Sequence, residues 1–143
     1  MLEKENMSFG KSDTLIRDKQ GRTVFHKCCL DQNPRILNLC IQKLKMTSIN
    51  ETKFYEQLDI YINMKDVYNN TPLLLACIYD YEAKSVDREK TIDILLEHGA
   101  NPNCQNMYTG FTPMHWEARY GKDDSIKKFI RYDAIEFIPD SRG

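Results

Sequence analysis

The sequence has no charge excess of either sign and no long apolar run. Its 143 residues include 20 Lys or Arg and 21 Asp or Glu, a formal net charge of −1. A chain so close to neutrality has no long-range field to attract nucleic acid or an anionic membrane. The longest apolar stretch, residues 73–78, is far shorter than the ~20 residues that span a bilayer. We therefore expect no nucleic-acid partner and no membrane insertion.

A secretory signal and a metal-binding cysteine pattern are also missing. Residues 1–8 contain Glu3, Lys4 and Glu5 and no apolar core, unlike a signal peptide. The cysteines number five, which is odd, and none forms a Cys-x-x-Cys pair of the kind that zinc sites use. We expect reduced, buried thiols in an intracellular, cytoplasmic protein that holds no metal and no cofactor.

The sequence contains no recognisable catalytic constellation. Gly10-Lys11-Ser12 lacks the upstream glycine and the preceding strand of a phosphate-binding loop. Cys28 follows His26 by two positions, and side chains two apart on a helix point away from each other. We therefore expect no enzymatic activity, and the enzyme alternative would require a reactive cysteine.

What the sequence does contain is a pattern repeated three times around a threonine. The three segments align without gaps, each with a threonine two positions after a turn-forming glycine or asparagine. These pairs are Gly21 and Thr23, Asn69 and Thr71, and Gly110 and Thr112. Glycine and asparagine tolerate a left-handed backbone, and threonine caps helices. Pro72 and Pro113 follow two of the threonines, so a helix is expected to begin there.

A second apolar pattern of helical period follows each copy. These patterns predict helices near residues 35–44, 91–98 and 125–132. Gly99 directly follows the second of them, as expected at a helix C-terminus. Each unit is thus predicted to contain a turn and two helices.

These units resemble ankyrin repeats, whose pattern has a T-P-L-H-x-A core and a G-A-x-x-N ending. The motif T-P-M-H-W at 112–116 and H-G-A-N-P-N at 98–103 match closely, and D-x-x-G-x-T at 18–23 and T-P-L-L-L-A-C at 71–77 support them. The resemblance runs from about residue 17 to the end. It implies an all-α helical solenoid of about three repeats with short hairpin loops.

The spacing of the turns predicts where the units begin and end. Family repeats are about 33 residues long, whereas the turn positions here are 48 and 41 apart. We expect an N-terminal extension at 1–16 and repeats at 17–65, 66–105 and 106–139, with insertions near 45–59 and 80–87. Each insertion is either a surface loop or a carrier of function. Residues 140–143 restate the turn pattern, so we expect a fragment of a longer ankyrin-repeat protein.

The resemblance also assigns structural roles. It implies that His26 and His115 hydrogen-bond the threonine three positions earlier and so tie each turn to its helix. The residues expected to build this scaffold are Gly21, Thr23, His26, Thr71, Pro72, Gly99, Gly110, Thr112, Pro113 and His115. Glu117 stands where the family has a small, buried alanine. We expect a shifted helix that lets Glu117 reach solvent; the alternative is an ion pair with a basic residue.

Family members bind protein targets on a concave face made of hairpin tips and first helices. Carried over position by position, this face includes Lys19, Lys27, Val67 and Leu75. Its expected binding residues, chosen because aromatic and arginine side chains are common interface anchors, are Arg22, Tyr68, Tyr79, Tyr108, Phe111, Trp116, Arg119 and Tyr120.

Three functions remain open at this point. We expect a monomeric module that binds a partner protein or peptide, in the way of a scaffold. The first alternative is a regulatory or substrate-recruiting module of a larger enzyme or membrane protein, such as an acyltransferase, kinase or channel. The second is a spacer without a partner, in which the aromatic side chains would be buried core.

Overall fold

A computed structural model describes residues 16–78, 86–119, 123–135 and 138–142 of the chain. Within these ranges the chain forms seven α-helices and no strand. The helices are α2 (Val24–Leu30), α3 (Pro34–Thr47), α4 (Glu51–Ile62), α5 (Pro72–Cys77), α6 (Val86–Glu97), α7 (Pro113–Arg119) and α8 (Asp123–Arg131).

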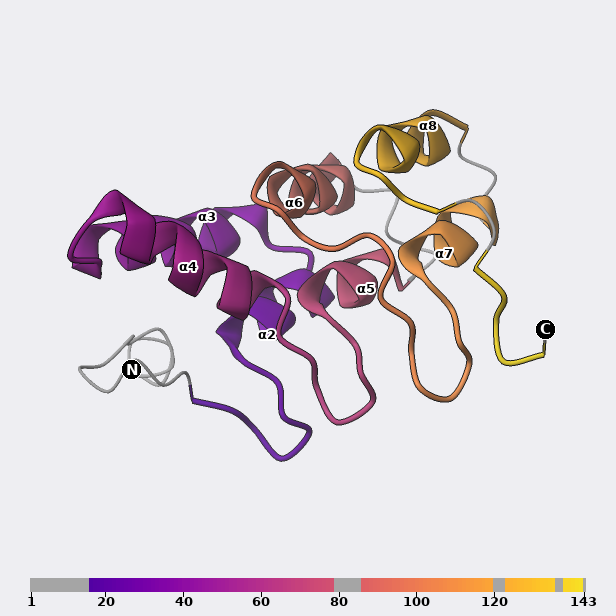
Figure 1. Cartoon of the computed structure of the whole chain (residues 1–143), viewed down its shortest axis with the longest axis horizontal. Coiled ribbons are helices and arrows are strands. Elements are labelled where there is room, and N and C mark those ends of the chain that lie inside the picture. Colours follow the sequence, from indigo (N-terminus) through magenta and orange to yellow (C-terminus); the bar gives the residue numbers. More distant parts are fainter. Residues whose placement is uncertain (1–15, 79–85, 120–122, 136–137, 143) are drawn as a thin grey trace.

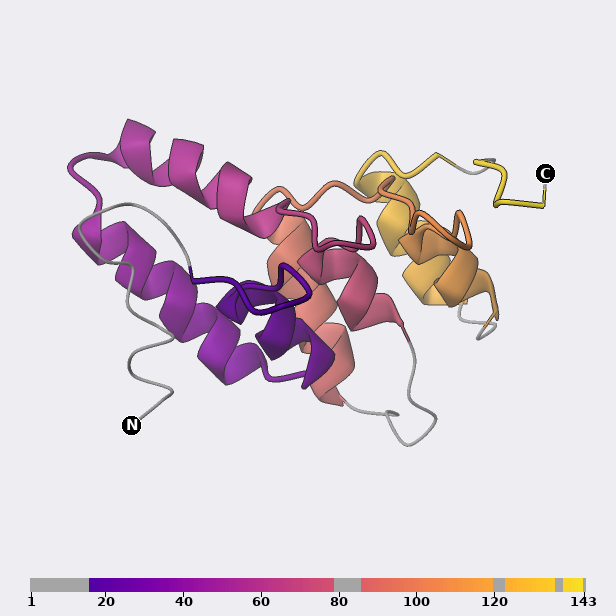
Figure 2. The ribbon, with the colours of Figure 1, turned by 90° about the horizontal axis from the view of Figure 1, so that it is seen from below.

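Six of the helices form two parallel rows. Helices α2, α5 and α7 make an inner row, and α3, α6 and α8 make an outer row behind it (Figure 1). The loops that precede α2, α5 and α7 all extend from the same side of the molecule, and we call them fingers. Seen from below, the fingers follow one another along the length of the stack (Figure 2). The chain is therefore an all-α repeat solenoid, as the sequence predicts.

The helices begin where local side chains can cap them. The Thr71 hydroxyl accepts a hydrogen bond from the Leu74 N–H at 3.2 Å, and Pro72 occupies the first helical position. Asn33 caps α3 in the same way, through the Ile36 N–H. These caps satisfy backbone donors that would otherwise lack a partner, and the predicted helix positions are confirmed to within a few residues.

The insertion expected near residues 45–59 contains a helix, α4, that the sequence analysis missed. Its side chains Phe54, Leu58, Tyr61 and Ile62 are buried, and they recur with the spacing of one helix face. The Tyr61 ring lies 6.2 Å from that of Phe25 on α2. This insertion is therefore packed into the core of the first unit and is not a surface loop. The second insertion, near 80–87, lies mostly outside the described residues.

All five cysteines are unpaired and buried, as expected. Burial raises the pKa of the Cys29 and Cys104 thiols, because a thiolate is poorly solvated there. In the described part of the chain, no helix has both the length and the apolar character to cross a bilayer.

The expectation that Glu117 reaches solvent was wrong. Its side chain is fully buried, and its Oε1 lies 2.5 Å from Nη2 of Arg88 on α6. Arg88 Nη2 also donates to the Cys77 carbonyl at 3.1 Å. The alternative interpretation, an ion pair, is correct. Arg88 on α6 reaches the buried position on α7 where the family pattern has an alanine and this chain has Glu117.

A second set of charges joins α6 to α8. Lys128 Nζ lies 2.5 Å from Asp93 Oδ1 and 3.4 Å from Glu89 Oε2. These contacts connect the second unit to the third along the outer row, and the Arg88–Glu117 pair connects them from the outer row to the inner row.

Candidate partner-binding surface

Each finger is a tight turn closed by one acidic or amide side chain. In the first finger, the Asp18 carboxylate accepts the N–H groups of Gln20 and Arg22, both at 2.9 Å. Asp66 accepts two backbone N–H groups of the second finger at 2.8 and 2.9 Å. Asn106 does so in the third, at 2.8 and 3.0 Å. Such Asx side chains shape turns without help from a sheet.

The third finger is one residue longer than the other two. The turn is closed by Gly21 N to Asp18 O in the first finger, and by Gly110 N to Asn106 O in the third. Because Asn106 has the role of Asp18, the residue equivalent to Lys19 is Met107. The gap-free alignment around the threonines is therefore displaced by one position at the start of this finger, and the extra residue lies inside the turn.

Backbone hydrogen bonds join neighbouring fingers. Val67 N donates to Gln20 O at 2.8 Å, and Met107 N donates to Tyr68 O at 3.0 Å. Ser141 N donates to Thr109 O at 2.9 Å and continues the series. The fingers consequently present their tips as one continuous surface.

Side chains tie the same fingers together a second time. Arg22 Nε donates to Asp66 Oδ2 at 3.1 Å, between the first and second fingers. Asn70 holds the position equivalent to Arg22, and its Oδ1 accepts from Asn106 Nδ2 at 2.9 Å. The residue before the threonine of one unit thus contacts the turn-closing residue of the next. Arg22 is half-buried and engaged here, so it is not a free anchor for a partner.

His26 connects its own turn to the following finger. The Thr23 N–H donates to His26 Nδ1 at 3.1 Å, so Nε2 carries the ring proton and donates to Asn70 O at 3.0 Å. The bond that Nδ1 accepts requires a neutral ring, and burial lowers the pKa of His26. In the third unit, the N–H of Thr112 donates to Nδ1 of His115 at 2.9 Å.

Aromatic side chains gather on the second and third units. The rings of Tyr68 and Tyr108 lie 5.9 Å apart at the fingertips. Phe111 stacks on His115 at 5.2 Å and meets the Trp116 ring edge-on at 5.3 Å. Such offset and edge-to-face geometries are favourable for aromatic pairs.

The exposed fractions show which of these side chains a partner could touch. Tyr108 is 68% exposed and Met107 is 54% exposed, whereas Tyr68, Phe111 and Trp116 are half-buried. The exposed set therefore includes Met107, which the predicted set omitted. The sequence did contain a sign of this, because one extra residue near Asn106 shifts the alignment and makes Met107 the equivalent of Lys19 at the fingertip.

The remaining predicted positions have mixed outcomes. Arg119 is exposed on α7. Leu75, which the family pattern places on the face, is buried. Tyr79 and Tyr120 lie outside the described residues. We define the finger surface by its exposed and half-buried apolar residues, which are Val67, Tyr68, Met107, Tyr108, Phe111 and Trp116.

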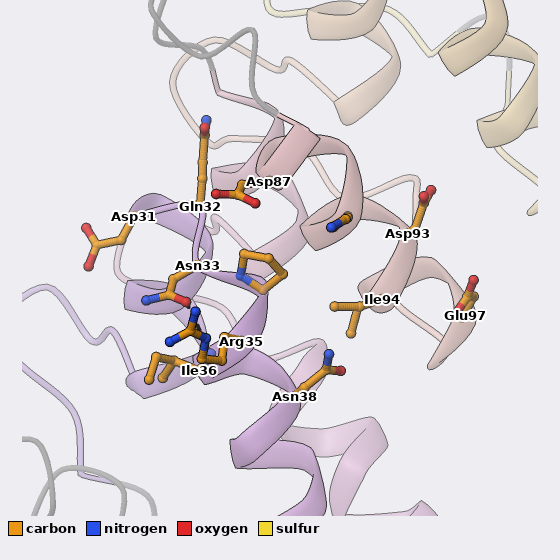
Figure 3. A pocket seen from close by; sticks show the side chains of 12 residues that line it. Asp31, Gln32, Asn33, Arg35, Ile36, Asn38, Asp87, Asp93, Ile94 and Glu97 are labelled. Carbon is orange, nitrogen blue, oxygen red and sulfur yellow. Dashed lines mark hydrogen bonds between the residues drawn. The ribbon is translucent and has the colours of Figure 1, made fainter.

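A hollow of about 890 Å³ lies between the start of α3 and α6 (Figure 3). Its charged lining residues are Asp31, Arg35, Asp87, Lys90, Asp93 and Glu97. Carboxylates outnumber basic groups there by four to two. The half-buried Ile36 and Ile94 also line it. This hollow is open and acidic, in contrast to the finger surface.

Pairs of helices, Asx-closed fingers and a threonine–histidine tie define a helical repeat protein of the ankyrin type. The ankyrin-repeat family profile matches residues 68–107, the second finger through the start of the third. Residues 68–107 are therefore an ankyrin repeat, and the helix pairs before and after them follow the same pattern.

Proteins similar to this chain come from viruses and an insect. It is 35% identical over 88 residues to the putative ankyrin repeat protein FPV031 of fowlpox virus, covering 61% of this chain and 26% of that protein. It is 28% identical over 115 residues to the ankyrin repeat protein OPG189 of variola virus, covering 79% and 18%.

It is also 26% identical over 132 residues to the NF-kappa-B inhibitor cactus of Drosophila melanogaster, covering 83% of this chain and 25% of cactus. The chain spans about a quarter or less of the length of these relatives.

Ankyrin repeats are in general protein–protein interaction modules.

Proposed function

We propose that this protein binds a segment of a partner protein on its finger surface. The observation that carries the proposal is the exposure of Met107 and Tyr108 at adjacent positions of a finger fixed on both sides. Because backbone hydrogen bonds already fix this finger, its backbone loses little conformational freedom when a partner covers the side chains. Tyrosine and tryptophan also predominate among residues that contribute strongly to binding.

The fixed geometry of the fingers supports recognition of an extended segment. The fingertips follow one another along the stack, each joined to the next by a backbone hydrogen bond between Gln20 and Val67 or between Tyr68 and Met107. A partner that lies across several fingers meets polar groups on the first finger and apolar and aromatic groups on the second and third. Such an arrangement suits a linear segment better than a small molecule.

The test compares two double variants of the same composition. Met107→Ala/Tyr108→Ala removes the fingertip side chains, and Met46→Ala/Tyr55→Ala removes an exposed methionine and tyrosine from the first unit, where Met46 is 85% and Tyr55 56% exposed. Circular dichroism checks that both are folded. Each protein, and the parent chain, is used for affinity capture from a cell lysate with quantitative mass spectrometry.

We expect one set of proteins to be retained by the parent chain and by the Met46/Tyr55 variant but lost by the fingertip variant. Retention of the same proteins by all three would place binding elsewhere on the molecule. Retention of no protein by the parent chain would also contradict the proposal.

A further inference from the structure

The formal charge is distributed very unevenly along the chain. Residues 16–46 contain seven Arg or Lys and two Asp, a formal net charge of +5. Because the whole chain carries −1, the other residues together carry −6. Residues 16–46, which include the first finger, α2 and most of α3, are thus a basic region on a protein whose other residues are acidic in sum.

Part of this positive charge is free on the finger side. Lys19 and Lys27 are exposed, and so is Arg17. The neighbouring Asp18 carboxylate is turned toward the backbone N–H groups of its own finger, and these bonds lower its pKa despite the opposing effect of burial. Asp66 of the next finger is buried against Arg22. The exposed basic groups therefore face solvent, while the Asp18 and Asp66 carboxylates are engaged. The exposed Asp31 carboxylate, at the end of α2, is the nearest opposing charge to Lys27.

The basic and apolar parts of the fingers are adjacent. Lys19 occupies the same turn position as Val67 and Met107, and the next residue, Gln20, accepts the Val67 N–H. One row of fingertips thus changes from a cation in the first unit to aliphatic side chains in the second and third. The hollow between α3 and α6 contains more carboxylates than basic groups, and one of them, Asp93, is paired with Lys128. It therefore attracts an acidic segment less than the first finger does.

We propose that the bound segment has a fixed polarity, with carboxylates over the first unit and apolar side chains over the second and third. This inference rests on the proposed function of the finger surface and adds the chemistry and direction of the partner segment. Asp or Glu side chains would lie near Arg17, Lys19 and Lys27. Aliphatic or aromatic side chains would pack on Met107 and Tyr108. Charge complementarity of this kind sets orientation and accelerates association more than it adds affinity.

The probe is a random linear-peptide library displayed on phage, selected on the full chain. Counter-selection on the folded Met107→Ala/Tyr108→Ala variant removes peptides that bind elsewhere. We expect the selected peptides to be enriched in Asp and Glu toward one end and in apolar residues toward the other. One such peptide is then synthesised and its affinity measured by fluorescence anisotropy.

Two charge-reversal variants test the basic region. Lys19→Glu/Lys27→Glu should weaken binding of the synthetic peptide about tenfold at low salt, since two favourable pairs become repulsive. The matched control Lys43→Glu/Lys127→Glu changes the net charge equally at exposed positions of α3 and α8 and should bind within about twofold of the parent. Raising the salt concentration should reduce the difference.

The direction of the peptide is measured with a nitroxide spin label at its acidic end. The label should broaden the amide NMR signals of Lys19 and Lys27 and leave that of Tyr108 sharp. Selected peptides without acidic enrichment, equal affinity of the two charge-reversal variants, or broadening centred on Tyr108 would overturn the polarity while leaving the finger surface as the binding site. A library that yields no peptide dependent on Met107 and Tyr108 would overturn both.

Discussion

Arg88 on α6 and Glu117 on α7 form a buried ion pair, with 2.5 Å between Nη2 and Oε1 and at most 2% of either side chain exposed. The pair crosses from the outer helix of one unit to the inner helix of the next. Removing two charges from water is costly, and their attraction offsets that cost only while both remain in place. The pair therefore fixes the position of α7 against α6 more than it adds net stability.

Removing one partner of this pair should be far worse than removing both. Glu117→Ala removes the nearer, fully buried carboxylate and leaves the Arg88 guanidinium only the longer contact with Glu89 Oε1 at 3.5 Å. We expect a loss of about 3 kcal/mol in the free energy of unfolding. The double variant Arg88→Met/Glu117→Ala should recover most of that loss. Urea denaturation followed by circular dichroism measures both. A double variant no more stable than Glu117→Ala would contradict this account.

The buried histidine of the first unit predicts a loss of stability in mild acid. The unfolded chain binds a proton at His26 near the ordinary pKa of about 6.5, whereas burial lowers the pKa of His26 in the folded protein. The unfolded state therefore binds more protons just below pH 6.5, and stability falls as the pH falls through that range. The slope from one such group is at most about 1.4 kcal/mol per pH unit.

The comparison variant is His26→Gln, which removes this titration. Its free energy of unfolding should be lower than that of the parent at about pH 8, because the bonds to Thr23 and Asn70 are disturbed. It should also depend less on pH between about 6.5 and 5. Parallel stability profiles for the two proteins would show that His26 is not the responsible group.

Alanine substitutions at two glycines with positive φ distinguish the cost of backbone strain from the cost of steric contact. Gly99 has φ +91°, and a Cβ there would meet nothing within 4 Å. Gly110 has φ +69°, and its Cβ would lie 2.5 Å from the Ser141 nitrogen. Gly99→Ala should cost about 1–2 kcal/mol for the left-handed conformation. Gly110→Ala should cost at least about 1 kcal/mol more, because the next finger must move.

Thermal or urea unfolding of the two alanine variants provides this measurement. Equal losses in the two proteins would mean that residues 140–142 yield without cost and that the contact with the third finger is weak.

The five cysteine thiols should not react with thiol reagents while the protein is folded. All are buried, and burial raises the pKa of Cys77 as well as those of Cys29 and Cys104. A hydrogen bond with Cys28 lowers the pKa of Cys40, but this thiol is completely enclosed and no reagent can reach it. Reaction with an aromatic disulfide reagent should therefore follow unfolding, and its rate should rise with urea. A thiol that reacts rapidly in the native state would contradict this expectation and would revive the reactive cysteine that an enzyme would need.

The repeat architecture could be predicted because its signals are local. A turn residue, a capping threonine and a proline in the first turn act within a few positions, so Asn69, Thr71 and Pro72 suffice to place α5. The start of the third finger was predicted one residue too late, because the turn that Asn106 closes is one residue longer than those that Asp18 and Asp66 close.

Features that depend on tertiary placement were harder to predict. The partner of Glu117 is 29 positions earlier in the sequence, and nothing local indicates that α6 would point Arg88 at it. Helix α4 did leave a signal, with Asn50 as its cap and Phe54 and Leu58 one helical turn apart. Treating the excess length as a tolerated loop concealed that signal.

The fingers also determine how the molecule would respond to tension. Each unit holds the next through a backbone hydrogen bond, Val67 to Gln20 and then Met107 to Tyr68. A pull on the two ends of a solenoid loads such neighbour-to-neighbour links in series. We therefore expect the interfaces between units to open one at a time when the ends are pulled apart.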